Sequence, residues 1–297
     1  MRKLLSFLAI TAFAATVASC QTPAPANPTP KKLLVVTVTT AFRHASIPQL
    51  EKMLADLGKE SGEFTVDYIH QPPEPAGRRP GPTATPEVQQ AYADAQVKFR
   101  EALTNDLKQL APENLKKYDA VVFASTTGEM PIPDPQGLLD WIKNGHAFIG
   151  IHAASDTFHR WPEYLDMLGG EFDHHGMQLS IDCLNQDPKN PATAALPPIW
   201  TIDQEEVYQF KKYDPTKVHD LLILDKQPDP SRKPGHYPVS WCKPYGTGHV
   251  FYTSIGHRED IIDSDPNMAN RKKSVEISKA YRAHVLGGIE WALGLKK

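Results

Sequence analysis

Residues 147–156 read Ala-Phe-Ile-Gly-Ile-His-Ala-Ala-Ser-Asp, and this stretch indicates the fold class. Ala147–Ile151 is a short, continuously apolar run, which is typical of a strand buried on both faces of a sheet. A helical pattern precedes it over Gln136–Lys143 and ends at Asn144 and Gly145. Strands that alternate with helices in this way predict an α/β fold with a mainly parallel sheet and helices on both faces.

The same alternation continues in both directions along the chain. Further strands are predicted at Leu33–Val38, Phe64–Ile69, Ala120–Ala124 and Val250–Ile255, and helices at Ser46–Leu57, Glu87–Gln109, Glu163–Leu168 and Val275–Leu293. A more β-like region has short strands at Gln178–Cys183, Val207–Phe210, Leu221–Leu224 and Val239–Cys242. The proline-rich residues 72–86 are predicted to form a loop. We therefore expect one domain over residues 32–297.

Composition excludes several classes of protein. The 32 Lys and Arg residues against 35 Asp and Glu give a formal net charge of -3, without the basic excess of a nucleic-acid binder. Three cysteines are too few for a disulfide-built scaffold or a four-thiolate zinc site. Whether Cys183 and Cys242 form a disulfide stays open. The 27 prolines gather mainly in four stretches, which predicts long ordered loops.

The N-terminus has the pattern of an export signal. Arg2 and Lys3 precede the apolar run Leu4–Val17, and small residues lead to Cys20. Val17-Ala-Ser-Cys20 resembles the bacterial lipoprotein box, so residues 1–19 are predicted to be a signal peptide and Cys20 to be lipidated. Residues 20–31 would then be the lipidated cysteine and a proline-rich linker. We expect an exported, membrane-anchored lipoprotein that faces the periplasm or the cell exterior; ordinary cleavage with a free Cys20 is the alternative.

Three of the twelve histidines follow predicted parallel strands: His44, His152 and His257. In open α/β sheets, ligands bind beyond the carboxyl ends of the strands, so these histidines are expected to share one cleft. Histidine transfers protons near neutral pH and is a common metal ligand.

His152 occupies the apex of Gly150-Ile-His-Ala-Ala154, a strand entering a tight turn of small residues. The pattern resembles a nucleophile elbow, but the apex holds neither Ser nor Cys, which argues against acyl transfer through a covalent intermediate. His152 is therefore either an acid–base group or metal ligand, or a buried histidine bonded to the backbone.

A divalent metal ion is the one cofactor that the sequence suggests. Asp173-His174-His175, with His152 and Asp156, offers nitrogen and oxygen ligands, although the spacing matches no standard metal motif. Adjacent residues of a strand face opposite sides, so one of the two neighbouring histidines is expected to face the cleft.

Glu206 lies in an acidic turn that leads into a short strand containing Tyr208. It is either a general base or sugar-hydroxyl acceptor, or part of a solvated acidic loop. Trp161 and Trp241 flank these motifs. Aromatic rings beside carboxylates suit a carbohydrate ligand, although aromatic residues more often pack in the core.

Gly150–Tyr164 and Gly169–His175 resemble the signature of the ThuA-like (trehalose utilisation) family. Further blocks match in the same order at Thr40–Ile47, Glu205–Tyr208, Pro238–Cys242 and Tyr245–His257. The resemblance implies a flavodoxin-like domain related to class I glutamine amidotransferases, whose elbow carries a catalytic cysteine where this chain has His152. The proline-rich insertion at 71–86 and the loop at 185–198 depart from shorter members, which leaves the shape of the cleft open.

The resemblance further implies action on 3-keto-glycosides such as 3-ketotrehalose, made by a partner sugar 3-dehydrogenase. A base, His152 or Glu206, would remove the C2 proton, and an acid, His44 or His257, would serve the leaving oxygen. Arg43 or a bound metal would stabilise the enolate. Expected substrate contacts are Arg43, Thr127, Asp156, Trp161, Tyr208 and Trp241, and the candidate metal ligands are His152, Asp156, His174 and His175. A non-catalytic carbohydrate-binding lipoprotein and a metal-dependent hydrolase of another small substrate stay open as alternatives.

Overall fold

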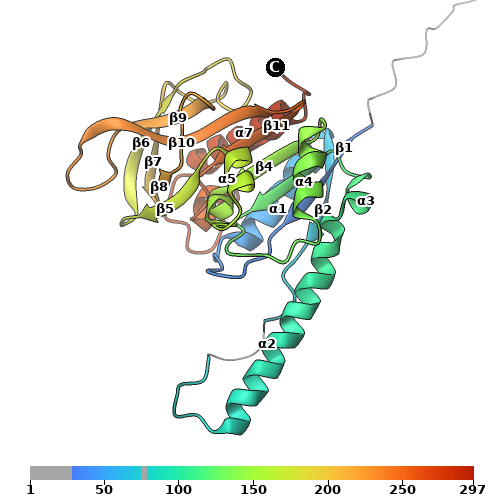
Figure 1. The fold of residues 1–297 in the computed structure, drawn as a ribbon. Coiled ribbons are helices and arrows are strands. Elements are labelled where there is room, and N and C mark those ends of the chain that lie inside the picture. The colour runs from blue at the N-terminus through green and yellow to red at the C-terminus, as the bar shows by residue number, and fades with distance from the viewer. Residues whose placement is uncertain (1–28, 75–78) are drawn as a thin grey trace, which may run out of the picture.

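The computed structural model describes residues 29–74 and 79–297, so the predicted signal peptide and Cys20 lie outside the described residues. Its centre is a nine-stranded sheet in the order β2-β1-β3-β4-β11-β10-β9-β6-β7 (Figure 1). The strands of this sheet are β1 (Lys31–Val36), β2 (Phe64–Ile69), β3 (Ala120–Ala124), β4 (Ala147–Ile151), β6 (Leu179–Asn185), β7 (Ile199–Glu205), β9 (His219–Lys226), β10 (Pro234–Tyr245) and β11 (Gly248–Thr253).

The parallel part of the sheet confirms the predicted flavodoxin-like α/β fold. β2, β1, β3, β4 and β11 pair in parallel, with Val35 opposite Val122 and Ile149 opposite Phe251. Every residue of β3 and β4 is buried, as their continuously apolar sequences predict. The carboxyl ends of these strands therefore meet along one edge.

The later strands extend the sheet in antiparallel fashion from β11 through β10, β9, β6 and β7. A separate antiparallel pair joins β5 (Glu171–His175) to β8 (Tyr208–Lys211). β5 and β7 were not predicted. Both carry polar residues, and β5 is exposed over its last three positions, so neither shows a continuous apolar run.

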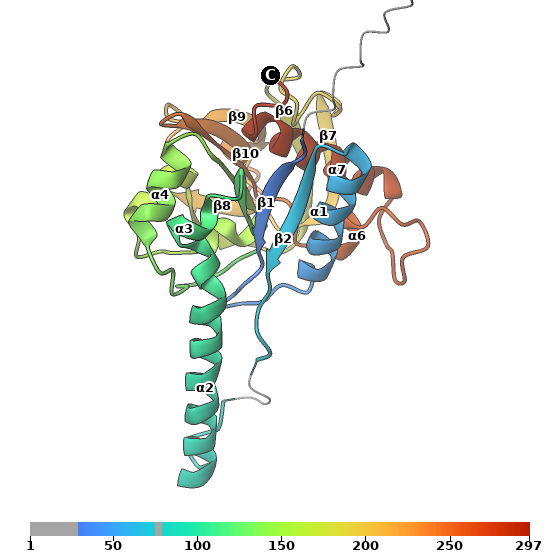
Figure 2. The ribbon, with the colours of Figure 1, turned by 90° about the vertical axis from the view of Figure 1, so that its right-hand side faces the viewer.

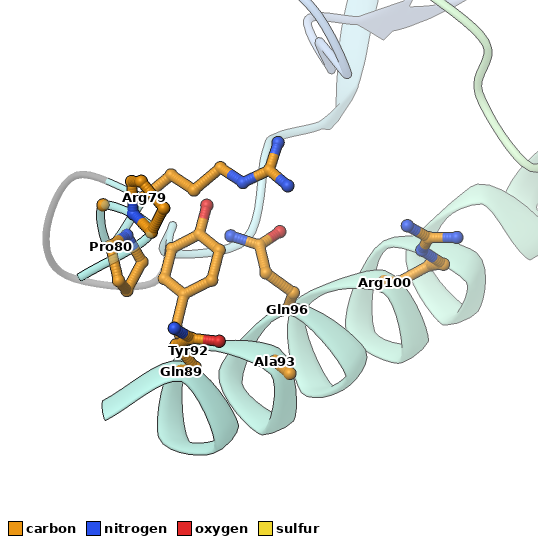
Figure 3. A pocket seen from close by; sticks show the side chains of 9 residues that line it. Arg79, Pro80, Gln89, Tyr92, Ala93, Gln96 and Arg100 are labelled. Carbon is orange, nitrogen blue, oxygen red and sulfur yellow. The ribbon is translucent and has the colours of Figure 1, made fainter. Parts of the chain in front are cut away.

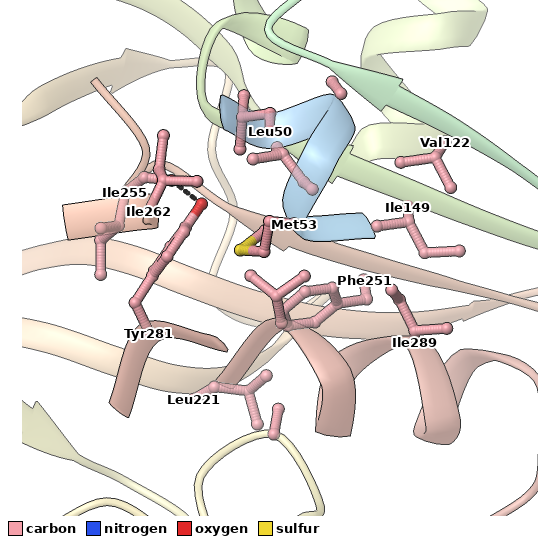
Figure 4. Packing of buried hydrophobic residues seen from close by; sticks show 14 of the residues in the cluster. Leu50, Met53, Val122, Ile149, Leu221, Phe251, Ile255, Ile262, Tyr281 and Ile289 are labelled. Atoms are coloured by element: carbon pink, nitrogen blue, oxygen red, sulfur yellow. Dashed lines mark hydrogen bonds between the residues drawn. The ribbon is translucent and has the colours of Figure 1, made fainter. Parts of the chain in front are cut away.

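Helices cover both faces of the sheet, as Figure 2 shows. The helices are α1 (Ile47–Ser61), α2 (Pro86–Asp106), α3 (Pro112–Leu115), α4 (Pro135–Lys143), α5 (Pro162–Leu168), α6 (Glu259–Ile262) and α7 (Val275–Ala292), with short 3₁₀ turns η1 (Leu107–Leu110) and η2 (His152–Asp156). α1 and α7 pack on one face, where Met53 and Ile289 meet Phe251 (Figure 4). α4 and α5 cover the other face.

The α2 helix extends away from the body of the molecule (Figures 1 and 2). Leu103, near its C-terminal end, is its one buried residue.

Among the residues that the structure describes, no helix is both long and apolar enough to cross a membrane. Cys183 and Cys242 are both buried free thiols, which answers the open question of their pairing.

An ionic cluster ties β5 to η2 and to the end of β8. The Glu171 carboxylate is 2% exposed and lies 2.8 Å from His159 Nδ1, 3.2 Å from Lys211 Nζ and 2.7 Å from Lys212 Nζ. His159 Nε2 lies 2.8 Å from Asp156 Oδ1. Burial alone would raise the pKa of Glu171, but Lys212, His159 and Lys211 lower it to about 2.

This cluster predicts a pH-dependent loss of stability. Because the folded-state pKa of Glu171 lies below its ordinary value of 4.5, its contribution is present above pH 4.5 and is lost as the pH falls through about 2. Glu171→Gln should lower the unfolding free energy at pH 7 by about 1–2 kcal/mol, and the difference from wild type should vanish near pH 2. Urea unfolding at several pH values measures this. The exposed Glu276→Gln is the control, and a difference that is independent of pH would contradict the assignment.

Candidate active site at the carboxyl edge of the parallel strands

The carboxyl edge of the parallel strands brings three histidines together. His44, His152 and His257 follow β1, β4 and β11, and their sequence positions span more than 200 residues. The ring centroids of His44 and His152 lie 4.6 Å apart, those of His44 and His257 5.6 Å, and those of His152 and His257 5.7 Å. The expected shared site is therefore a compact cluster.

His152 stands at a strained turn between β4 and η2. Its φ of 51° lies in the left-handed region, which non-glycine residues seldom adopt. The Tyr252 hydroxyl donates to the His152 carbonyl at 2.8 Å, and Gly256 passes so close that a Cβ there would lie 3.2 Å from that of His152. The backbone thus has the sharp turn of an elbow, with an imidazole at its apex.

The His152 ring has one nitrogen fixed by the backbone and one facing the cluster. Nδ1 donates to the carbonyl of Ser254 at 2.7 Å, which places the proton of the neutral ring on this nitrogen. Nε2 then accepts from the Tyr208 hydroxyl at 3.0 Å. The ring is therefore buried and bonded to the backbone through Nδ1, while Nε2 faces the cluster.

Glu206 reaches the cluster from the connection between β7 and β8. Its Oε2 lies 3.0 Å from His257 Nδ1 and 3.8 Å from His152 Nε2, whereas Oε1 lies 3.8 Å from His175 Nε2. The neighbouring Glu205 is fully buried and accepts the backbone N–H of Glu206 at 3.0 Å and of His257 at 3.2 Å. Glu205 therefore holds the acidic turn and the end of β11 together.

Burial and mutual repulsion keep His44 and His152 uncharged. Burial, with His257 nearby, lowers the pKa of His44 to about 4, and burial with His44 nearby lowers the pKa of His152 well below its usual range. Burial would raise the pKa of Glu206, but His257, His175 and His44 lower it instead, so this carboxylate is ionised at neutral pH. Burial raises the pKa of Glu205 to about 8.

The cluster opens to solvent on the side of His257 and His175. Their side chains are 21% and 37% exposed, against 10% for Glu206. A hollow of about 300 Å³ adjoins His257 and Ala45. Phe42 beside His44 is a further exposed ring, 65% accessible, with centroids 4.8 Å apart. His257 and His175, which both lie beside Glu206, are therefore more exposed than the carboxylate itself.

Other predicted substrate residues surround the cluster in different roles. Arg43 donates to the Thr37 carbonyl at 2.7 Å and to Gln71 at 3.1 Å, so its guanidinium is engaged beyond β1. The buried Thr127 hydroxyl donates to the Phe42 carbonyl at 2.8 Å and so positions the loop that carries His44. Asp156, at the end of η2, pairs with His159 as described above.

One of the two predicted tryptophan contacts, Trp241, is corrected by the structure. Trp241 is fully buried between Phe210 and Tyr252, and its indole N–H donates to the Leu168 carbonyl, because inward positions of β10 pack into the core. Half-buried Trp161 packs on Phe158 and Tyr164. Aromatic content by itself does not distinguish core from surface, so the expected stacking role of Trp241 is wrong.

The expected metal set is also brought together only in part. His174 pairs with Asp173 at 2.8 Å and is 58% exposed, whereas His175 faces Glu206. Successive side chains of a strand point to opposite faces, so the rings of His174 and His175 lie on opposite sides of β5. The described residues that can jointly hold a metal are instead His44, His152, Glu206 and His257.

Sequence reasoning missed His159 and Glu171, which pair across the turn from η2 to β5. The spacing of His159 three residues after Asp156 was the available signal.

A larger hollow of about 730 Å³ lies between α2 and the segment around Pro80, where Tyr92 and Gln96 point toward that segment (Figure 3). It shares no lining residue with the histidine cluster.

Comparisons with known proteins agree with this architecture. The family model of ThuA, described as trehalose utilisation, matches residues 73–292. A ThuA-like protein of known structure from Parabacteroides merdae is 17% identical, with 90% of this chain and 91% of that chain covered and a TM-score of 0.61. One from Bacteroides uniformis is 17% identical, with 92% and 95% covered and a TM-score of 0.59.

At these identities the solved structures show a shared fold. A comparison with curated proteins finds no match. The family model spans His152, Glu206 and His257 of the cluster. Since that match covers most of the sequence, the chain belongs to the ThuA, or trehalose utilisation, family.

Proposed function

We propose that this protein is an enzyme of oxidised-sugar catabolism that removes the proton beside the keto group of a 3-keto-glycoside such as 3-ketotrehalose. The observation that carries the proposal is the ionised Glu206 carboxylate beside the buried, uncharged His44 and His152. A base in this setting can act on a weakly acidic C–H bond. The description of the family as trehalose utilisation supports a carbohydrate substrate.

The chemistry needs a base, an electrophile and, for cleavage, an acid. Glu206 takes the C2 proton, and the C2–H electron pair forms a C2–C3 double bond while O3 becomes an enolate oxygen. For isomerisation, the O2 hydroxyl proton moves to O3, which places the enolate oxygen on C2, and a proton then adds to C3 as the C2–O2 bond becomes the ketone. Alternatively, the C1–O bond breaks, a C1–C2 double bond forms, the ketone at C3 returns and the departing oxygen takes a proton.

The structure favours particular groups for these roles. His152 is fully buried with both ring nitrogens engaged, so Glu206 is the better base of the two that the sequence offered. Arg43 is engaged with Thr37 and Gln71, which leaves stabilisation of the enolate to the histidine cluster. In place of His44 and His257, we assign protonation of the leaving oxygen to His175, which is exposed beside Glu206 Oε1.

The base role is tested by Glu206→Gln. The amide cannot accept the proton, so enzyme-dependent deuterium incorporation at C2 of 3-ketotrehalose in deuterated water should fall by about 10²–10⁴-fold. NMR of the sugar measures this. Asp203→Asn, on the same β7 edge and exposed, should exchange at the wild-type rate. Full exchange by a folded Glu206→Gln protein would refute the assignment.

The acid role is tested separately by His175→Gln. Release of the C1 group should slow by roughly 10²-fold, because the leaving oxygen loses its proton donor. Exchange at C2 should stay within about threefold of wild type, because Glu206 is untouched. Equal loss of both steps would show that His175 is not the leaving-group acid. Saturable sugar binding without exchange by wild type would instead favour the non-catalytic binding protein.

The sequence-based expectation of export remains part of the proposal. A lipidated Cys20 would hold the domain at the membrane, where a sugar 3-dehydrogenase would supply the keto-sugar. In a bacterial host, the wild-type chain should partition into the detergent phase and Cys20→Ser into the aqueous phase. Identical partitioning of both would contradict lipidation at this residue.

A further inference from the structure

We infer that His44, His152, His257 and Glu206 form a site for one divalent transition metal ion. This set shares only His152 with the ligands expected from the sequence. The inference deepens the proposed function by supplying the electrophile for the enolate, and that catalytic consequence rests on the proposed function. Metal binding itself is a property of the four side chains and is measured without any sugar.

The geometry of the cluster is close to that of a bound ion. One ligand atom from each of the four side chains lies within 4.8 Å of all the others. Four ligands about 2.1 Å from a tetrahedral metal are roughly 3.4 Å apart. The separations of Glu206 Oε2 from His257 Nδ1, 3.0 Å, and from His152 Nε2, 3.8 Å, bracket that value. Small ring rotations would complete the coordination.

One ring nitrogen of the cluster, Nδ1 of the 6% exposed His44, lacks a hydrogen-bond partner within the described part of the chain. Nδ1 of His257 faces the Glu206 carboxylate, whose Oε2 lies 3.0 Å away. An unsatisfied buried polar atom costs about 1–3 kcal/mol, so such atoms call for an explanation. A bound cation would provide this explanation, because a metal ion accepts a nitrogen lone pair that no hydrogen-bond donor reaches.

The surroundings orient the rings as metal ligands are usually oriented. His152 donates its Nδ1 proton to the Ser254 carbonyl, which directs the Nε2 lone pair into the cluster. A metal would replace the Tyr208 hydroxyl on that nitrogen. His257 Nε2 lies 2.8 Å from the side-chain amide nitrogen of Gln178. When this amide is turned by 180°, its oxygen faces His257 and accepts a hydrogen bond from a proton on Nε2. The lone pair of Nδ1 is then available to the metal.

The donor set indicates the kind of ion. Three imidazoles and one carboxylate suit Zn²⁺, Mn²⁺, Fe²⁺ or Co²⁺, whereas Mg²⁺ and Ca²⁺ prefer oxygen ligands. Glu206 directs Oε2 toward the histidines and Oε1 toward His175. The carboxylate can therefore bind the metal through Oε2 and keep Oε1 for the proton of the substrate.

The test uses the full chain in detergent, stripped with a chelator and titrated with Zn²⁺ or Co²⁺. We expect one ion per chain by elemental analysis, and a visible Co²⁺ absorption typical of nitrogen and oxygen ligands. His44→Gln and His257→Gln should each weaken Zn²⁺ binding by at least about 100-fold, with circular dichroism confirming that they fold. His174→Gln, outside this set, should bind as wild type does.

Different outcomes separate this inference from the proposed function. Absence of stoichiometric metal and of the Co²⁺ spectrum in folded wild type would overturn the metal site, and sugar exchange by that protein would leave the proposed function intact. Loss of binding in His174→Gln but not in His44→Gln would overturn the ligand set. Stoichiometric metal without exchange on a panel of keto-sugars would uphold the site and reject the proposed function.

Discussion

The hydrogen bond from His152 Nδ1 to the Ser254 carbonyl is the contact on which the site depends. It links the residue just after β4 to the residue just after β11, two parallel neighbours in the sheet. It also fixes the proton on Nδ1, so that Nε2 faces the other histidines. The strained φ of His152 is held by this bond and by the Tyr252 hydroxyl on the same residue's carbonyl. A buried imidazole thus becomes part of a site rather than of the core.

Two halves of the molecule supply different chemistry to that point. The parallel strands deliver the histidines, as the carboxyl edge of an open α/β sheet delivers ligands in general. The later antiparallel strands deliver Glu206, directly after β7 of the extended sheet, and Tyr208, at the start of β8 of the separate pair. Buried Glu205 joins the halves by accepting backbone N–H groups from both sides. The carboxylate and the imidazoles of the cluster thus come from different parts of the chain's strand order.

The protonation states of the buried side chains in the site depend mainly on burial and then on the charged or polar groups beside them. Desolvation keeps His44 and His152 uncharged, and their lone pairs are then free for ligation or proton transfer. Glu206 stays ionised because three histidines surround it, although burial opposes this. Farther out, Glu171 is stabilised as an anion by His159 and two lysines. Both carboxylates therefore stay ionised in spite of their burial, because histidine or lysine side chains lie beside them.

The sequence by itself determined the parallel strands, their helices and the edge where His44, His152 and His257 gather. Continuous apolar runs and helical spacing are local signals, and they were sufficient for β1, β3, β4, β11, α1 and α7. It did not show β5 and β7, whose polar, partly exposed residues carry no such pattern. Likewise, Trp241 in the core and Glu206 beside the histidines were decided by tertiary structure. Side-chain burial and the meeting of distant turns depend on how strands pack, which no local pattern contains.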